Sequence, residues 1–177
     1  MDEPAGGTDL ACFVRDVADF PRPGIVFRDI TPLLADAVAF ADALDRLARP
    51  FRGAVDLVAG VEARGFIFAA PVAARLGAGF VPIRKPSKLP WETVSASYEL
   101  EYGIDTLEMH RDAVGPGRRV LLVDDVLATG GTAEAAASLL TGSGAELVGA
   151  AFLIELAFLG GRSRLGGVGT HSVLTYD

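Results

Sequence analysis

The sequence has a single cysteine, Cys12, and only two histidines, so it offers little material for cross-links or metal centres. A lone cysteine excludes an intramolecular disulfide, and this favours a reducing compartment, which we take to be the cytoplasm. No cysteine and histidine cluster has the spacing of a zinc site. We therefore interpret His110 and His171 as surface residues rather than ligands.

Long hydrophobic runs are also missing. Apolar stretches such as residues 147–154 fall far short of the roughly 20 residues that a transmembrane helix needs. The first residues, MDEPAGGTD, are acidic and polar, unlike a secretory signal. Positive charge is scarce too: the net charge is −7, whereas a nucleic-acid surface needs a basic face. We expect neither a membrane nor a nucleic acid as a partner, but a small phosphorylated substrate remains compatible with these figures.

What the sequence does contain is enough apolar material for one compact domain, residues 1–177. Half of the residues are hydrophobic and 22% are charged, which excludes a disordered chain. Apolar periodicity predicts helices at 9–17, 37–49, about 62–76 and 132–140, and strands at 55–60, 80–84, 119–123, 146–154 and 170–176. This alternation indicates an α/β fold with a parallel sheet, whose ligands lie beyond the carboxyl ends of the strands.

One segment, residues 93–109, has a different pattern. Its residues alternate between polar and apolar, which predicts a β-hairpin with its turn near residues 103–105. The aromatic and polar content of this hairpin suits a mobile flap over a site.

The strongest motif is VLLVDDVLATGGT, residues 120–132. A buried strand ends in Asp124 and Asp125, and a glycine-threonine loop then opens a helix. Glycines let backbone N–H groups approach an anion, and a helix N-terminus supplies further donors, so the loop predicts a phosphate cradle. The paired carboxylates suit the vicinal hydroxyls of a ribose or a nearby Mg²⁺. The alternative is that the acids only cap a loop and the glycines only make a turn. The motif lacks the lysine of a Walker loop and the spacing of dinucleotide folds.

This motif resembles the phosphoribosyl pyrophosphate (PRPP) site of type I phosphoribosyltransferases. The resemblance implies that family's fold, a twisted parallel sheet flanked by helices, with a small N-terminal hood at about residues 1–35 and a flexible β-hairpin flap at about 93–109. It places PRPP on Asp124, Asp125, Ala128, Thr129, Gly130, Gly131 and Thr132.

Residues 20–176 are similar to adenine phosphoribosyltransferases, and four further segments carry that resemblance. The first is FPRPGIVFRDITP, residues 20–32, which in the family belongs to the hood over the base. It implies that Phe27 stacks on adenine while the backbones of Val26 and Arg28 read the edge of the base.

The second segment, GVEARGF at residues 60–66, resembles the family's pyrophosphate loop and implies that Arg64 binds phosphate oxygens. In the family a non-proline cis peptide often strains this loop, and it would fall between Glu62 and Ala63. The third segment, IRKPSKLP at residues 83–90, forms a dense cationic patch with Arg84. Lys85 and Lys88 match the positions that contact pyrophosphate.

The fourth segment, SYELEYG at residues 97–103, lies on the expected flap. Glu101 matches the family's catalytic acid, which assists proton movement as the N9 atom of adenine attacks, whereas Glu99 is the neighbour most easily mistaken for it. Leu156, expected just after the strand 146–154, resembles the apolar contact under the base.

The resemblance implies an enzyme of purine salvage, in which PRPP and adenine give AMP and pyrophosphate. It also implies Mg²⁺, held mainly through PRPP with no protein ligand directly assigned, and a homodimer. Two alternatives stay open. One is a sister enzyme for xanthine, orotate, or hypoxanthine and guanine; the other is a non-catalytic regulator that senses PRPP or a nucleotide.

Overall fold

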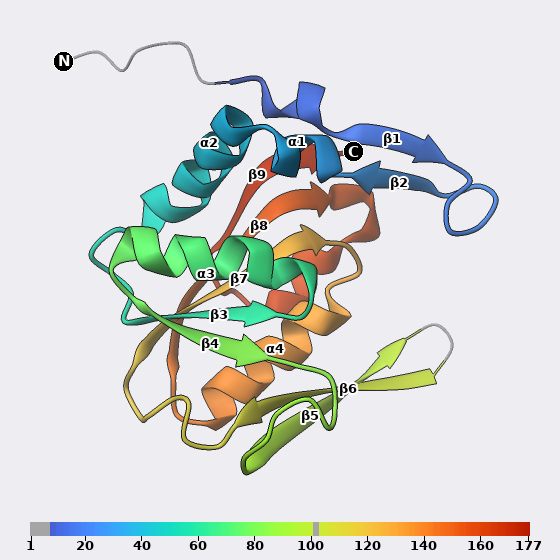
Figure 1. The fold of residues 1–177 in the computed structure, drawn as a ribbon. Helices are drawn as coiled ribbons and strands as arrows, with labels where there is room; N and C mark the ends of the chain where they lie inside the picture. The colour runs from blue at the N-terminus through green and yellow to red at the C-terminus, as the bar shows by residue number, and fades with distance from the viewer. Residues whose placement is uncertain (1–7, 101–102) are drawn as a thin grey trace. The chain divides into compact units, whose positions relative to one another are not determined.

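The computed structural model describes residues 8–100 and 103–177. The chain divides into two compact units, residues 1–46 and residues 47–177. Figure 1 shows the course of the chain through both units.

The first unit contains a short β-hairpin followed by two helices. Its elements are η1 (Leu10–Phe13), β1 (Arg15–Ala18), β2 (Val26–Asp29), α1 (Thr31–Ala35) and α2 (Ala37–Ala48), the last of which runs two residues past the unit boundary. The strands are antiparallel, and Val17 lies opposite Phe27. The side chain of Asp36 accepts hydrogen bonds from the backbone N–H groups of Val38 and Ala39, which fixes the start of the expected helix α2.

The predicted helix at residues 9–17 is wrong beyond its first turn. Asp9 accepts a hydrogen bond from the N–H of Ala11 and so caps the short 3₁₀-helix η1, but Val14 is already extended. From Arg15 the chain pairs with β2 as a strand. The apolar spacing of residues 9–17 suits a helix. Pairing with β2, which follows the Pro/Gly turn, outweighs this local helical preference.

The second unit is built on a five-stranded parallel sheet with the order β4-β3-β7-β8-β9. The strands are β3 (Leu57–Val61), β4 (Gly79–Ile83), β7 (Arg119–Leu127), β8 (Glu146–Leu156) and β9 (Thr170–Tyr176). The remaining elements of this unit, apart from a hairpin, are η2 (Arg49–Phe51), α3 (Arg64–Leu76), α4 (Gly131–Gly142), η3 (Ala157–Leu159) and η4 (Gly161–Leu165). The predicted α/β class and parallel sheet are confirmed.

Helices α3 and α4 cover opposite faces of this sheet (Figure 1). On β7, Val120 and Leu122 belong to the core cluster that also contains Leu139 of α4. The alternate residues of the strand are buried as well, on the face that α3 covers. A strand buried on both faces reads as a continuous apolar run, which explains the sequence RVLLV. In the described part of the chain, no helix is long and apolar enough to cross a membrane.

The predicted hairpin is confirmed as β5 (Thr93–Leu100) and β6 (Gly103–His110). The predicted turn at 103–105 is wrong, because Gly103 already pairs with Leu100 and Asp105 with Tyr98. The alternating pattern of the sequence does not distinguish a turn from paired strand at residues 103–105. The buried side chains of Leu107 and Met109 join the core cluster on the α4 side of the sheet.

The two histidines are less exposed than expected. His110 is half-buried, and its Nε2 is buried without a hydrogen-bond partner among the described residues. His171 is also half-buried and meets the ring of Phe51 edge-on, with ring centroids 6.4 Å apart. Both side chains keep partial contact with solvent, so they lie near the surface but are more covered than a typical surface residue.

Candidate active site at the carboxyl ends of the strands

The loop between β7 and α4 is shaped by glycine, and we call this loop together with the first two residues of α4 the phosphate loop (residues 128–132). Gly130 has φ of +86° and directly precedes the first residue of α4. A Cβ atom at Gly130 would lie 2.5 Å from the carbonyl oxygen of Gly161, so no other residue fits without a shift. The loop therefore leads into the N-terminus of a 12-residue helix, where unpaired N–H groups and the positive dipole end favour an anion.

Asp124 and Asp125 lie inside β7 rather than after it. The strand was expected to end at Val123, but it pairs with β8 as far as Leu127, which lies opposite Glu155. The reason is that β8 is also longer than expected and ends at Leu156, so hydrogen-bonding partners remain available beyond the apolar run. The two carboxylates are therefore held by the sheet and not by a loop.

These two carboxylates lie next to each other and are largely shielded from solvent. Asp125 is only 6% exposed, and its backbone N–H donates to Oδ1 of Asp124 at 2.9 Å. Asp124 is half-buried, and burial together with the charge of Asp125 raises its pKa well above the usual range. The Nε of Arg64 lies 2.6 Å from Oδ2 of Asp125, yet this buried oxygen accepts no hydrogen bond from the described residues.

Arg64 begins α3, directly after the loop that follows β3. The peptide bond between Glu62 and Ala63 is cis, as the family resemblance implies. Glu62 accepts a hydrogen bond from the backbone N–H of Lys85 at 2.5 Å and forms an ion pair with Arg84 at 2.8 Å. Burial opposes its charge, but these contacts lower the pKa of Glu62. The loop after β3 and the loop after β4 are thus joined through one carboxylate.

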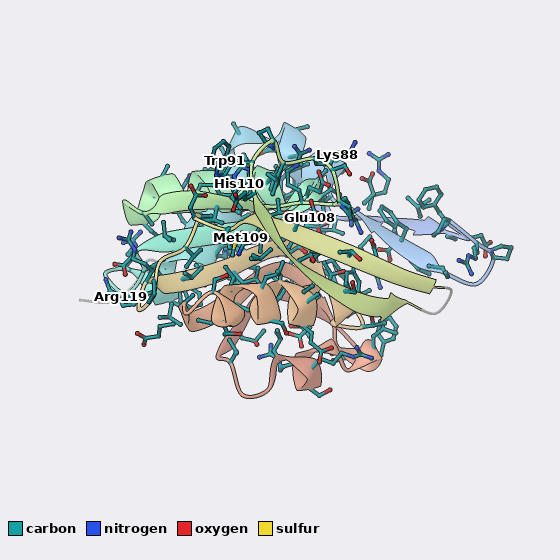
Figure 2. All side chains as sticks on the ribbon, turned by 90° about the horizontal axis from the view of Figure 1, so that it is seen from below. Lys88, Trp91, Glu108, Met109, His110 and Arg119 are labelled. Carbon is teal, nitrogen blue, oxygen red and sulfur yellow. The ribbon has the colours of Figure 1, made fainter. Side chains whose placement is uncertain are left out.

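The cationic patch expected at residues 84–88 is therefore partly neutralised within the chain. Arg84 is paired with Glu62, and Lys85 is paired with Asp105. The side chain of Lys88 is exposed (Figure 2), and the neighbouring backbone N–H of Ser87 donates to Glu108. Figure 2 places Arg119, at the start of β7, at the opposite end of the unit from Lys88.

Lys85 belongs to a hydrogen-bonded cluster that the sequence did not reveal. Its Nζ contacts the carboxylate of Asp105 and lies 3.4 Å from the hydroxyl of Tyr98. Tyr98 donates to Asp105 at 3.0 Å and accepts from the hydroxyl of Thr132 at 3.2 Å. Burial opposes the charge of Lys85, but the hydrogen bonds with Asp105 and Tyr98 raise its pKa. Because these residues are far apart in the sequence, only the folded chain brings them together.

A second cluster that the sequence did not reveal, formed by Glu155, Arg162 and Ser172, supports the phosphate loop through η4. Glu155 is 5% exposed and accepts hydrogen bonds from Arg162 at 2.9 and 2.5 Å and from Ser172 at 2.6 Å. The bond from Arg162 is the main cause of the lowered pKa of Glu155. This pairing anchors η4, and η4 carries Gly161 against the phosphate loop. In the sequence, only the pair Gly160-Gly161 directly before Arg162 could have indicated a close backbone approach at this position.

The remaining predicted site residues fall in three places. Leu156 is the last residue of β8 and is half-buried. Val26, Phe27 and Arg28 are consecutive on β2 of the first unit, where Phe27 meets Phe20 edge-on with ring centroids 5.2 Å apart and Arg28 pairs with Asp16. Glu101 lies outside the described residues.

No group of three or more histidine, cysteine, aspartate or glutamate residues arranged for a metal ion occurs within residues 8–100 and 103–177. Any divalent cation at this site would therefore take most of its ligands from a bound molecule and from water.

Comparison with known proteins agrees with this geometry. Residues 31–164 match the phosphoribosyl transferase domain family. The chain is 60% identical over 164 residues to the adenine phosphoribosyltransferase of Thermobifida fusca (strain YX), covering 92% of this chain and 93% of the relative. The adenine phosphoribosyltransferase structure from Rhodothermus marinus DSM 4252 is 52% identical, with a TM-score of 0.89 over 94% of this chain and 96% of that one.

A third match is the Saccharomyces cerevisiae adenine phosphoribosyltransferase, solved with an imino-altritol bisphosphate and adenine. It is 39% identical, with a TM-score of 0.88, and the match covers 93% of this chain and 96% of that chain. The matches span nearly the whole length of both partners, and the fold agrees with that of the solved structures. The chain belongs to the phosphoribosyltransferase family and, within it, to the adenine phosphoribosyltransferases.

Proposed function

We propose that the carboxyl ends of the parallel strands form the active site for transfer of the phosphoribosyl group of PRPP to adenine, which gives AMP and pyrophosphate in purine salvage. The observation that carries the proposal is the sequence of parts along β7 and α4. An acid pair is followed by a glycine loop and the N-terminus of a long helix. That order suits a ribose bearing a 5-phosphate.

The 5-phosphate of PRPP would lie on Ala128, Thr129, Gly130, Gly131 and Thr132. The N-terminal N–H groups of α4 have no partners within their own helix, and the hydroxyls of Thr129 and Thr132 add further donors. The packing of Gly130 on Gly161 supports this role, since it fixes the loop before any ligand binds.

The ribose would lie beside Asp124 and Asp125, whose carboxylates can accept hydrogen bonds from its vicinal hydroxyls. Two facts bear on this assignment. Oδ2 of Asp125 is buried without a hydrogen bond from the described residues, and the pKa of Asp124 is raised by burial and by its neighbour. Burial and the neighbouring charge disfavour the ionised form of Asp124, so this acid would gain from the hydroxyls of a ligand, while Asp125 is balanced by its ion pair with Arg64.

The pyrophosphate of PRPP would meet Arg64, Lys85 and Lys88. As the bond to the anomeric carbon breaks, negative charge collects on the departing pyrophosphate, and fixed cations stabilise that charge. The guanidinium of Arg64 is half exposed and can reach a ligand while it remains near Asp125. Arg84 is not placed in this set, because the family resemblance matches only Lys85 and Lys88 to the pyrophosphate contacts; the ion pair of Arg84 with Glu62 joins two loops.

The residues present are compatible with Mg²⁺ held mainly through PRPP. Magnesium is usually bound through one or two carboxylates plus substrate phosphates, and Asp124 and Asp125 supply such a pair. When bound, the ion would neutralise phosphate charge and stabilise the leaving group. The acidic balance of the protein, a net charge of −7, increases the need for such a counter-ion.

For the base, the proposal rests on family resemblance. Phe27 would stack on adenine, with Val26 and Arg28 reading its edge, and Leu156 would provide an apolar contact. Glu101 would assist the proton movement at the imidazole edge of adenine. Residues 1–35 would act as a hood and residues 93–109 as a closing flap of a single catalytic domain, and closure would exclude water that competes as nucleophile.

We further propose that the enzyme is a cytoplasmic homodimer. The single cysteine, which is exposed and forms no disulfide, supports a reducing compartment. The homodimer rests on family analogy.

The experiment that tests the activity is incubation with PRPP, Mg²⁺ and one base at a time, with the nucleotide product identified. We expect AMP from adenine and little product from guanine, hypoxanthine, xanthine or orotate. Turnover of guanine as efficient as that of adenine would instead assign the chain to a sister enzyme. PRPP binding without turnover of any base would favour a regulator.

A further inference from the structure

The cluster around Lys85 joins three segments of the second unit. Lys85 follows β4, Tyr98 and Asp105 lie opposite each other on β5 and β6, and Thr132 is the second residue of α4. None of the sequence motifs assigns a role to Tyr98 or Asp105. Both nevertheless lie between a lysine that we place on pyrophosphate and a threonine that we place on the 5-phosphate.

The hydrogen-bonding capacity of Tyr98 is used completely. A phenol has one donor and two acceptor positions. Tyr98 donates to Asp105 at 3.0 Å, accepts from Thr132 at 3.2 Å and lies 3.4 Å from the Lys85 ammonium. The ring is 9% exposed and packed in the core, so the hydroxyl has little freedom to move. A buried, saturated hydroxyl of this kind fixes the positions of its partners.

The capacity of Lys85 is used only in part. An ammonium group has three donors, of which Asp105 and Tyr98 engage two. The side chain of Lys85 remains 39% exposed, so its third donor is accessible to a ligand. A free lysine would lose considerable rotamer entropy on binding, whereas a lysine already held by two partners loses less.

We propose, resting on the proposed function, that Tyr98 and Asp105 are positioning residues that hold the Lys85 ammonium beside the phosphate loop, ready for the pyrophosphate of PRPP. They act through Lys85 and need not touch the substrate. The bond from Thr132 to Tyr98 ties this arrangement to the start of α4, so the pyrophosphate and 5-phosphate subsites share one hydrogen-bonded support.

Asp105→Asn and Tyr98→Phe test the proposal, because each keeps the shape of the side chain. The first removes the negative charge beside Lys85, and the second removes the hydroxyl together with its three contacts. The matched control is Thr106→Val on the same hairpin. It removes the exposed hydroxyl contact between Thr106 and Ser97, which are 2.9 Å apart, and leaves the cluster intact. The readouts are the binding of inorganic pyrophosphate with Mg²⁺, the binding of ribose 5-phosphate, and thermal stability.

We expect Asp105→Asn to weaken pyrophosphate binding by about tenfold, the effect of losing one well-oriented charged contact. Ribose 5-phosphate binding should stay within about twofold, since Asp105 does not reach the phosphate loop. Tyr98→Phe should also weaken pyrophosphate binding, and Thr106→Val should change neither ligand. A purely structural role would instead lower stability and weaken both ligands together.

A double-mutant cycle shows whether the effect passes through Lys85. In a Lys85→Ala background, adding Asp105→Asn should change pyrophosphate binding by no more than about twofold. The same loss in both backgrounds would overturn the proposal, as would unchanged or tighter pyrophosphate binding in Asp105→Asn and Tyr98→Phe. If Asp105→Asn does not fold, Tyr98→Phe is measured in the native and the Lys85→Ala backgrounds, and the same two outcomes support or overturn the proposal. These are binding measurements, so failure of the proposed AMP synthesis would be recognised separately.

Discussion

Gly65 and Asp124 approach each other so closely that no side chain fits between them. A Cβ atom at position 65 would lie 2.5 Å from Oδ1 of Asp124 and 3.4 Å from the backbone oxygen of Val123. Gly65 is the second residue of α3, so the carboxylate of Asp124 lies against the first turn of that helix. The acid pair and the loop that carries Arg64 are therefore one structural unit.

Gly65→Ala should displace the Asp124 carboxylate, because the new methyl group must push against either this side chain or the backbone of β7. We expect the KM for PRPP to rise at least about tenfold and stability to fall by about 1–3 kcal/mol, as for other overpacked sites. Steady-state kinetics and urea unfolding measure the two effects.

The control is Gly142→Ala at the end of α4, where a Cβ would meet nothing within 4 Å. Alanine is the better helix former by roughly 0.5–1 kcal/mol, so this variant should be as stable as the native chain or slightly more so. Equal kinetics in both alanine variants would show that the close approach of Gly65 to Asp124 has no functional role.

Asp124→Asn should raise the free energy of unfolding near neutral pH while it weakens PRPP binding. The folded pKa of Asp124 is raised above its usual value, so the folded chain holds this proton at a pH where the unfolded chain has lost it. Stability therefore falls as pH rises through the interval between the usual and the raised pKa, and the cost persists above it. Asparagine carries no charge and escapes this cost.

The variant should thus be more stable than the native chain at pH 7–8, and the difference should shrink as the pH approaches about 4, the usual pKa of an aspartate. PRPP binding should be weaker, because the amide is a poorer acceptor for ribose hydroxyls. Urea unfolding across this pH range gives the first result and titration with PRPP the second. A pH-independent difference in stability would contradict the assigned cause of the pKa shift.

Removal of divalent cations should abolish turnover. PRPP carries several negative charges, and the described residues provide no cluster of three metal ligands that could hold an ion independently of the substrate. The assay compares AMP formation before and after rigorous chelation, and then after Mg²⁺ is restored. Full activity in the chelated sample would refute the proposed role of the metal, and failure of Mg²⁺ to restore activity would point to damage by the chelator.

Glu101→Gln should lower kcat by roughly 10²–10⁴-fold, the usual effect of losing general acid–base assistance. The KM for adenine should change far less, because an interaction made mainly in the transition state affects kcat and kcat/KM together. Glu99→Gln is the matched control, being chemically identical and two residues away in the sequence. Equal losses in the two variants, or a defect confined to KM, would exclude Glu101 as the catalytic group.

The sequence predicted the sheet, α3, α4 and the glycine-containing connection between β7 and α4 because their signals are local. Apolar runs, a helix-ending glycine at Gly77 and the order of acids, glycines and threonines all lie within short segments. The exact end of β7 was missed because it depends on the neighbouring strand. β8 extends to Leu156 and offers backbone hydrogen-bond partners to β7 as far as Leu127. The β1 strand was missed for the same reason, since its partner β2 follows a turn.

The supporting contacts of the site could not be predicted because each joins distant parts of the chain. Glu62 meets Lys85, Asp105 meets Lys85, and Gly161 meets Gly130 only after the sheet has formed. The family resemblance implies a role for Lys85, but its partners depend on how the chain after β4 packs against the hairpin of β5 and β6. Non-local pairing of this kind leaves no periodicity in the sequence.

The claim that the phosphate loop holds the 5-phosphate of PRPP is tested most directly by comparing Thr132→Ala with Thr141→Ala. Both threonines lie on α4, but Thr132 is its second residue, whereas the hydroxyl of Thr141 donates to the carbonyl of Ala137 within the helix, at 2.9 Å. The measurement is the dissociation constant of PRPP with Mg²⁺ for the native chain and both variants. A hydrogen bond to a charged phosphate contributes about 1.5–3 kcal/mol, so Thr132→Ala should weaken binding by about 10- to 100-fold. Thr141→Ala should bind PRPP like the native chain. Equal affinities in all three proteins would contradict the placement of the 5-phosphate on this loop.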